Sequence, residues 1–437
     1  MSDPTNDHHN GGHPTTRSGG SDRSGAEHGL DVARIRKDFP ILEQLQDGRR
    51  LVFLDSAASS QRPRQVLEAM NHLYETGYAN VHRGAYRLAE QATSAYERSR
   101  ATVARFIGAA EPESVVFTKN ATESINLVAG SWGRANLGPG DAVVLTIMEH
   151  HANIVPWQML AQQLGFEIRW LPIDPDGTLD LTELDRYLDG AKVLAFTAMS
   201  NVLGTLNPVP ELTTAARAHG AISLVDACQW VPHLPTDVAA MGADFVAFSG
   251  HKMLGPSGIG VLWGRPELLE EMPPFLGGGG MILNVTTEGF TTDAPPGKFE
   301  AGTPPIAEAV GLAAAVEYLE ALGMEAVRRH EVELTAYALR KLHSVVGDDL
   351  VIHGPAEPAA RGGVLSLDLG GVHAHDVSQV LDQSAVCVRP GHHCAKPLMR
   401  ELGVTATARA SFYLYNDTDD VDTLADALVE ARDFFAL

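Results

Sequence analysis

Cysteine is scarce in this sequence of 437 residues, which holds only Cys228, Cys387 and Cys394. So sparse and odd a set does not make a disulfide framework and is typical of free thiols in a reducing compartment. Basic residues are also few, with 33 Lys and Arg against 55 Asp and Glu and a formal net charge of -22. Nucleic acids and anionic membranes are therefore unfavourable partners, because phosphate binding needs basic patches.

Long apolar runs are absent as well. No stretch reaches the roughly 18 apolar residues of a membrane span, and the N-terminus lacks the apolar segment of a secretory signal. We therefore expect a cytoplasmic protein. Residues 1–30 are mostly small and polar, and we expect them to be a disordered tail. The tail contains His8, His9, His13 and His28, which without fixed geometry would bind metal only incidentally.

Short apolar segments alternate with helical ones through most of the chain. The expected strands are 51–55, 114–118, 141–147, 167–171, 192–198, 221–226, 244–248 and 260–263. The expected helices among them are 63–78, 88–107, 121–131, 157–164 and 212–219. Alternating strands and helices predict an α/β fold with a mostly parallel sheet.

The pattern changes after residue 306. Helices are expected at 307–322, 325–346 and 421–434, and short strands at 364–369, 385–389 and 408–412. A chain of this length has room for two buried cores. We expect an N-terminal segment at 31–50 that packs with the smaller domain, a large domain at 51–309 and a small α+β domain at 310–437.

Polar side chains follow several of the expected strands. They are Thr122, His150, Asn201, Asp226 and Lys252. Parallel strands place their carboxyl ends on one edge of a sheet, so these side chains should lie close together. A lysine at a buried strand end is partly desolvated, which lowers its pKa and favours the amine that forms a Schiff base. A surface lysine in a turn is the alternative that the local pattern alone would favour.

The stretch from Lys119 to Glu123 predicts the start of a helix. Asn120 is expected as the N-cap of a capping box with Glu123. The free N–H groups and the Thr122 hydroxyl could bind an anion there. Gly277–Gly280, in contrast, lacks the Lys-Ser/Thr sequel of a phosphate loop, so a hairpin or interface loop is expected.

These groups match the needs of pyridoxal phosphate (PLP). That cofactor requires a Schiff-base lysine, a carboxylate at the pyridine nitrogen and a phosphate site, for which Lys252, Asp226 and Thr122 are the candidates. His150 is placed to cover one face of the ring. Asp226 could instead be a structural carboxylate, although a buried charge without a partner is costly.

Cys394 has an unusual setting for a lone cysteine, which is more often a small buried hydrophobe. It follows His392 and His393 in a Gly-containing loop near Arg389, and such polar, electropositive surroundings favour thiolate. Zinc binding by these two histidines with Cys394 and Cys387 is poorly spaced, so no metal site is expected.

The other two cysteines, Cys228 and Cys387, lie in apolar runs and are expected to be inert.

Several motifs together resemble those of the Suf-type (group II) cysteine desulfurases, which are fold-type I PLP enzymes of the class-V aminotransferase family. The resemblance extends from about Val32 to the C-terminus. Its motifs are Leu54-Asp-Ser-Ala-Ala58, Val81-His-Arg-Gly84, Met148-Glu-His-His-Ala-Asn-Ile-Val-Pro-Trp157, Ser200-Asn-Val-Leu-Gly204, Phe248-Ser-Gly-His-Lys252, Phe299-Glu-Ala-Gly-Thr-Pro304, Arg389-Pro-Gly-His-His-Cys394 and Arg409-Ala-Ser-Phe-Tyr-Leu-Tyr-Asn416.

The resemblance implies a fold and an activity. The large domain would hold a mostly parallel seven-stranded sheet, and the small domain would carry the nucleophilic cysteine. The enzyme would be a cytoplasmic homodimer that converts L-cysteine to L-alanine and supplies sulfur for iron–sulfur cluster assembly. A sulfurtransferase of the SufE or SufU kind would accept the sulfur.

The resemblance also implies cofactor-binding residues. Lys252 would form the Schiff base and move the Cα proton, Asp226 would pair with the pyridine nitrogen, Gln229 would bond the ring oxygen, and His150 would stack on the ring. The implied phosphate ligands are Ala121, Thr122, Ser249 and His251, together with Thr303 from the other subunit.

Substrate-binding residues follow in the same way. Cys394 would attack the substrate sulfur and keep it as a persulfide. The implied substrate-lining residues are Arg409 and Asn201 at the carboxylate, and His82 and Arg389 beside the sulfur.

Two departures, Pro390 and Pro305, could shift the cysteine loop or the cross-dimer loop slightly, but they remove no chemical group. The alternatives are a selenocysteine lyase, an aminotransferase, which would leave Cys394 unexplained, and a PLP-fold scaffold without catalysis.

Overall fold

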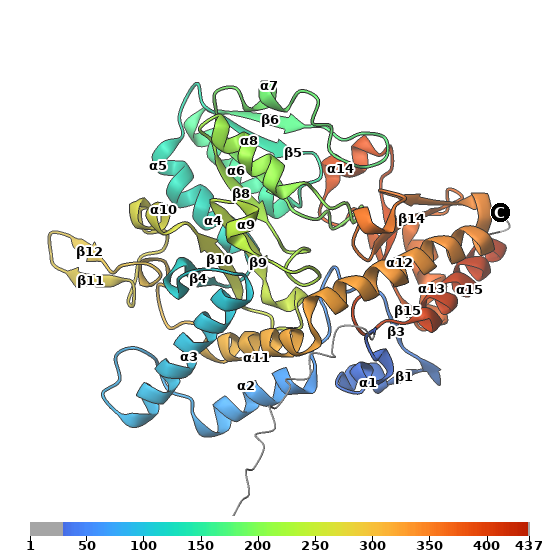
Figure 1. The fold of residues 1–437 in the computed structure, drawn as a ribbon, viewed down its shortest axis with the longest axis horizontal. Coiled ribbons are helices and arrows are strands. Elements are labelled where there is room, and N and C mark those ends of the chain that lie inside the picture. The colour runs from blue at the N-terminus through green and yellow to red at the C-terminus, as the bar shows by residue number, and fades with distance from the viewer. Residues whose placement is uncertain (1–28, 436–437) are drawn as a thin grey trace, which may run out of the picture.

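The computed structural model describes residues 29–435 (Figure 1). The tail expected at residues 1–30 therefore lies almost entirely outside the described part of the chain. No helix within the described residues is long and apolar enough to cross a membrane.

A mixed sheet of seven strands forms the centre of the larger part of the molecule. In spatial order its strands are β4 (Val115–Thr118), β10 (Gly260–Gly264), β9 (Phe245–Ser249), β8 (Ile222–Asp226), β7 (Ala191–Thr197), β5 (Ala142–Thr146) and β6 (Glu167–Leu171). Strand β10 runs antiparallel to β4 and β9, whereas the pairs from β9 to β6 are parallel. The mostly parallel sheet predicted from the alternation of elements is confirmed.

Helices cover both faces of this sheet. They include α2 (Arg64–Thr76), α3 (Arg87–Phe106), α4 (Ala121–Val128), α6 (Val155–Leu164), α8 (Val209–Ala218) and α11 (Ile306–Leu322). Along β5, Val143 and Leu145 belong to one apolar cluster and Ala142 and Val144 to another. Alternate residues thus enter separate cores, as expected for a parallel sheet buried on both faces.

A second, antiparallel sheet lies toward the C-terminus. Its strands are β13 (Leu350–His353), β14 (Val364–Leu369), β17 (Thr407–Ser411) and β16 (Arg389–Gly391). The helices α12 (Met324–Val346), α13 (Ala374–Gln383) and α15 (Thr418–Phe434) pack with it around a third apolar cluster. In Figure 1, α12 extends from the large sheet to this second group of helices.

The strand expected at residues 385–389 is two strands in the structure. Strand β15 (Val386–Cys387) pairs in parallel with β3 (Val52–Phe53), and β16 then pairs with β17. The prediction of one strand was wrong because neighbouring residues join different sheets. Strand β13 and helix α13 were also missed, although the apolar residues Val377 and Leu381 are spaced as on a helix face.

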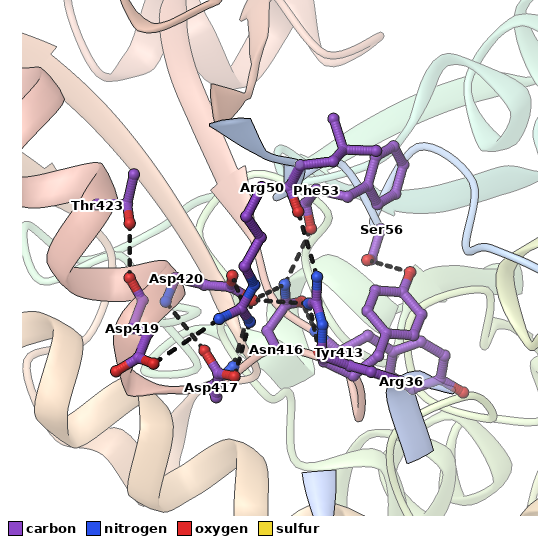
Figure 2. A network of polar contacts seen from close by, with 12 residues as sticks. Arg36, Arg50, Phe53, Ser56, Tyr413, Asn416, Asp417, Asp419, Asp420 and Thr423 are labelled. Carbon is purple, nitrogen blue, oxygen red and sulfur yellow. Dashed lines mark hydrogen bonds and ion pairs between the residues drawn. The ribbon is translucent and has the colours of Figure 1, made fainter. Parts of the chain in front are cut away.

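Shorter elements complete the described chain. They are α1 (Val32–Arg36), β1 (Leu45–Gln46), β2 (Arg49–Arg50), α5 (Arg134–Asn136), α7 (Leu184–Leu188), α9 (Val238–Met241), α10 (Pro266–Glu271), β11 (Ile282–Val285), β12 (Phe290–Thr292) and α14 (Lys396–Glu401). Gly277–Gly280 leads into the β11–β12 hairpin, which projects from the body of the molecule in Figure 1. Arg36 and Arg50 bring the N-terminal segment against the first turn of α15 (Figure 2).

Candidate active site

A cavity of about 240 Å³ lies where the carboxyl ends of the large sheet's strands meet the second sheet. Most of the residues that the sequence singled out line it. They are Ala121, Thr122, His150, Asn201, Asp226, Gln229, Ser249, His251, Lys252, Arg389, Cys394 and Arg409. Parallel strand order therefore collects the five side chains that follow strands of the large sheet at one edge, as predicted. Arg389 and Arg409 come from the second sheet, and Cys394 comes from the loop after β16.

Lys252 and Asp226 lie at neighbouring strand ends. Lys252 ends a single 3-10 turn that follows β9 directly, and Asp226 is the last residue of β8. Asp226 is 4% exposed, its Oδ1 accepts a hydrogen bond from the Cys228 N–H at 3.0 Å, and none of the ion pairs within residues 29–435 involves it. A carboxylate so buried is costly without a cation, so the pyridinium nitrogen of PLP fits this position.

Gln229 offers further polar atoms to the cavity. Its Nε2 donates one hydrogen bond to the Ala57 carbonyl at 2.7 Å. A side-chain amide has two N–H donors, so the second N–H of Gln229 has no partner among residues 29–435. Its Oε1 is buried without a partner within the described chain. Buried polar atoms are normally satisfied, and a polar ligand in the cavity would satisfy these.

The start of α4 forms the candidate phosphate site. The Ala121 N–H donates to Ser249 Oγ at 2.9 Å, and Asn120 Oδ1 accepts from the Glu123 N–H at 2.9 Å. The Thr122 N–H and hydroxyl remain at this helix N-terminus, where an anion is favoured.

The turn before α4 has an incomplete capping box, and strand β10 packs tightly against it. Asn120 caps α4 as predicted, but the Glu123 carboxylate accepts from the Lys119 N–H at 2.5 Å rather than from the cap residue, so the capping box is incomplete. Strand β10 passes very close, because a Cβ on Gly260 would lie 2.4 Å from Asn120 Cα. Only glycine permits this approach.

His150 precedes the short 3-10 turn His151–Asn153, and its Nδ1 accepts the Ala152 N–H at 3.1 Å. Burial, and then the charge of Lys252, lower the pKa of His150 to about 4. The ring is therefore neutral near pH 7 and carries its proton on Nε2. A neutral ring in this place suits stacking on a cofactor.

Glu149 is a residue that the sequence reasoning missed. Its carboxyl is fully buried and lies 2.5 Å from Thr146 Oγ1, 2.7 Å from Asn153 Nδ2 and 2.9 Å from the Thr197 N. Burial raises the pKa of Glu149 to about 8. Glu149 thus fixes the turn that carries His150. The available signal in the sequence was an acidic residue directly after the apolar run 142–148 and next to His150.

Arg409, on β17, is 2% exposed, and only some of its N–H donors have partners. Its Nη1 donates to the Asn201 carbonyl at 2.9 Å, its Nη2 lies 3.3 Å from Asp55 Oδ1, and its Nε has no partner within the described chain. Burial lowers the pKa of Arg409 to about 10, which leaves it cationic near pH 7. A carboxylate ligand fits this charge, and Asp55, which the sequence reasoning did not single out, holds it in place.

The loop around Cys394 is held by the large sheet's loops. His393 and Cys394 have φ values of 49° and 56°, in the left-handed region that non-glycine residues seldom adopt. The His151 N–H donates to the Cys394 carbonyl at 2.6 Å, and Asn201 Nδ2 donates to the His393 carbonyl at 2.8 Å. Such a conformation persists only when its surroundings enforce it.

The other two cysteines differ from Cys394. Cys228 is buried in the cavity wall, and burial raises the pKa of its thiol strongly. Cys387 lies on β15, where burial also raises its pKa. Both shifts favour the unreactive thiol.

Thr303 and His82 do not reach this cavity in their own chain. Both line a separate hollow with Glu300 and Asp293, and His82 Nε2 lies 3.8 Å from Glu97 Oε1. A role for His82 beside the Cys394 sulfur of the same chain is therefore not supported. Thr303 also borders a hollow shared with Asn120 and His251 at the candidate phosphate site.

Comparisons with known proteins agree on one family. The model of the aminotransferase class-V family matches residues 52–424. A probable cysteine desulfurase of Streptomyces coelicolor is 52% identical over 412 residues, which cover 93% of this chain and 98% of that protein. The cysteine desulfurase of Haloferax volcanii is 49% identical over 421 residues, with coverage of 93% and 98%.

Solved structures give the same picture. The apo cysteine desulfurase of Thermococcus onnurineus NA1 matches with a TM-score of 0.87 and 41% identity, over 93% of this chain and 98% of that one. The cysteine desulfurase CsdA of Escherichia coli, in an S-sulfonic acid form, matches with a TM-score of 0.84 and 38% identity, over 93% and 99%.

Proposed function

This chain belongs to the aminotransferase class-V family, and we propose that it is a PLP-dependent cysteine desulfurase that converts L-cysteine to L-alanine and leaves the sulfur on Cys394. One observation carries the proposal. A single cavity holds a strand-end lysine, a buried carboxylate, a buried arginine with a free donor, and the half-buried Cys394.

The described residues fit PLP. Lys252 would hold it covalently, Asp226 would pair with its ring nitrogen, and His150 and Gln229 would contact the ring. The phosphate would be held at the N-terminus of α4, by Ala121, Thr122, Ser249 and His251. When bound, the cofactor supplies an electron sink that stabilises negative charge at the substrate Cα.

Arg409 binds the substrate carboxylate through its free donor. Asn201 fixes this arginine through its carbonyl and the cysteine loop through its side-chain amide. The Lys252 amine moves the proton at the substrate Cα. Arg389 lines the same cavity as Cys394 and brings a positive charge to it.

Cys394 performs the sulfur step. Its Sγ attacks the substrate sulfur, so an S–S bond forms while the substrate C–S bond breaks. The electron pair of the broken bond stays with carbon, which takes up protons to become L-alanine. The sulfur stays as a persulfide on Cys394 and supplies iron–sulfur cluster assembly.

The proposed assembly is a C2 homodimer. Thr303 does not line the main cavity, but it borders the hollow beside His251 and Asn120. A second copy of the chain would cover this hollow and bring Thr303, with His82 nearby, to the phosphate site of its partner. A C2 dimer is the simplest closed assembly. A fully active monomer in sedimentation at assay concentration would contradict the dimer.

The sulfur acceptor is proposed to be a sulfurtransferase of the SufE or SufU kind, acting with this enzyme in the cytoplasm. Cys394 lies between β16 and α14, and the hydrogen bonds of its loop keep it at the cavity. The persulfide cannot travel far, so the acceptor must reach the pocket. Rapid mixing should show a burst of one alanine per subunit and a slow steady rate that the acceptor raises. Absence of both effects would contradict this assignment.

The proposed domain division places a large PLP-binding domain at 51–309 and a small domain at 310–437, with residues 31–50 against the latter. Separate apolar clusters around the two sheets support a division into two parts, whereas residue 310 falls inside α11, which packs in the cluster of the large sheet. The contacts of Arg36 and Arg50 with α15 support the placement of the N-terminal segment.

The test of the main proposal is direct. The purified protein, saturated with PLP, is incubated with L-cysteine, and alanine, sulfide and protein-bound persulfide are measured together. We expect alanine equal to the sum of sulfide and persulfide. Alanine without matching sulfur, or pyruvate in place of alanine, would overturn the proposal. A parallel assay with L-selenocysteine compares the two substrates.

A further inference from the structure

Three side chains of metal-ligating type meet at the edge of the cavity. Ligand atoms of His151, His392 and Cys394 all lie within 4.8 Å of one another, and each residue is half-buried. The two imidazole rings are 5.6 Å apart between centroids, at an interplanar angle of 36°. Within the described part of the chain this is the one cluster of at least three His, Cys, Asp or Glu residues with such spacing.

The cluster differs from the set of His392, His393, Cys394 and Cys387 that the sequence analysis considered and set aside. His393 points away, because its Nε2 contacts the carbonyl and hydroxyl of Thr407 at 3.1 and 2.9 Å. Cys387 pairs with Phe53 between β15 and β3. The residue that joins His392 and Cys394 instead is His151, from the turn after β5 and far away in sequence.

The chemistry of these groups suits a borderline-soft cation. Two imidazoles and a thiolate are ligands for Zn²⁺, and three protein ligands leave the fourth tetrahedral position to water. The half-burial of all three residues allows a cation to enter and a water molecule to remain bound.

Hydrogen bonds in the metal-free site limit its affinity. His392 Nδ1 accepts the Cys394 N–H at 3.1 Å, and His151 Nε2 accepts the Lys396 N–H at 3.1 Å. A neutral imidazole has one lone-pair nitrogen. To bind a metal, each ring must release its N–H partner or shift its proton. The affinity should therefore be lower than in a structural zinc site, and binding should be reversible.

We propose that His151, His392 and Cys394 form a reversible inhibitory site for a thiophilic divalent cation, with Zn²⁺ as its probe. A thiolate that is coordinated to the metal cannot attack the substrate sulfur. Inhibition rests on the proposed role of Cys394, whereas the site itself rests on geometry alone. The two are tested separately below.

The first test measures binding to the PLP-loaded, full-length protein without cysteine, since cysteine itself binds zinc. Competition with a chromophoric chelator measures the number of Zn²⁺ ions bound per subunit. The wild type should bind one more ion per subunit than Cys394→Ser. This difference excludes ions held by tail histidines. His151→Asn and His392→Asn should each weaken binding at least about tenfold, whereas His375→Asn, in the exposed pair with His373, should not. Equal binding by wild type and Cys394→Ser would overturn the site.

The second test measures access to the thiol. Zn²⁺ should slow iodoacetamide alkylation of Cys394 at least about tenfold, as followed by peptide mass spectrometry with a cysteine-free peptide of the same chain as internal reference. A chelator should restore the rate. The protection should disappear in His151→Asn, which retains Cys394.

Protection that persists in both histidine variants, or no protection at all, would overturn the inhibitory role. If the wild type binds zinc with the expected variant pattern but lacks desulfurase activity, the metal site stands and the proposed function fails. The two failures are therefore distinguishable.

Discussion

Arginines meet buried groups in two regions of this molecule, with different partners in each. Arg36 and Arg50 meet Asp420 at 3.3 and 3.0 Å, and Arg50 also meets Asp417 at 2.7 Å (Figure 2). Arg409 in the cavity has one carboxylate neighbour, and its Nε is unpartnered within residues 29–435.

The charged groups of the first region are largely paired with one another, and Asp420 Oδ1 lies 3.0 Å from Arg50 Nη2. Asp420 also accepts from Asn416 Nδ2 at 2.9 Å, and the capping box with Asp417 ties it to the start of α15. The cavity instead keeps Gln229 Oε1 and Arg409 Nε unpaired. The first arrangement holds the segment 31–50 against α15. The second leaves polar atoms of the cavity without partners, so they can bind a ligand. Substitutions in the two regions should therefore affect different quantities.

The largest effect is expected for Lys252→Ala. Loss of the amine that moves the Cα proton should lower turnover by roughly 10⁴-fold or more. The wild-type protein should be yellow, and borohydride should bleach it and fix PLP on Lys252. Mass spectrometry of the labelled peptide checks the attachment. A wild type that stays colourless after reconstitution with PLP would contradict the cofactor assignment.

Cys394→Ser should separate the two halves of the reaction. The variant should still bind L-cysteine with a spectral change at the cofactor, because Lys252 and Arg409 remain. Alanine formation should fall about 10³-fold, and no persulfide should form. Cys228→Ala is the matched control, since that buried thiol has no role in sulfur transfer. Wild-type alanine release by Cys394→Ser would exclude Cys394 as the acceptor.

Asp420→Asn tests the region in which Arg36 and Arg50 share this carboxylate. Its side chain is fully buried, so removal of the charge leaves Arg36 and Arg50 without their shared partner. The free energy of unfolding should fall by about 3 kcal/mol, while turnover per folded molecule stays unchanged. Asp419→Asn is the control, because that side chain is 80% exposed and 3.8 Å from Arg50. Its effect should stay below about 0.5 kcal/mol. A loss of turnover in an Asp420→Asn protein that is fully folded would show that this region also supports catalysis, and would contradict the comparison.

The smallest effect concerns pH. Burial, and then the charge of Arg409, lower the pKa of His393 to about 3. The unfolded chain takes up this proton near pH 6.5, but the folded chain does not until far lower pH. The free energy of unfolding therefore decreases as the pH is lowered through this interval. Between about pH 6.5 and pH 5 the protonation of this one group should lower the free energy of unfolding by about 2 kcal/mol.

His393→Asn removes the titrating group and should flatten the curve by that amount. Denaturant unfolding at several pH values measures it, with the exposed His375→Asn as control. Equal slopes for His393→Asn and wild type would show that His393 is not buried in its neutral form.

The sequence was informative where chemistry follows a buried strand. Asp226 and Lys252 were predicted from their positions after apolar runs, and the cavity contains both. Sequence order was a poor guide elsewhere. The segment 385–389 divides between two sheets, since hydrogen bonds to β3 and β17 decide the strand ends and both partners are remote in sequence.

Residues that support the site were harder to find. Asp55 and Glu149 act by holding Arg409 and the His150 turn, and such roles depend on contacts between distant segments. His82 stays a prediction. Its motif predicted a place beside the Cys394 sulfur, and within one chain it lines another hollow.

The sequence by itself determined the α/β class, most elements of the large sheet and the residues with catalytic potential, because apolar periodicity and side-chain chemistry are local properties. Only the tertiary structure decided which of these residues meet. It placed His151 rather than His393 beside His392 and Cys394, held the left-handed backbone at Cys394 through the His151 N–H, and left Arg409 Nε without a partner in the described chain. Each of these depends on contacts between segments far apart in the chain, which no local pattern specifies.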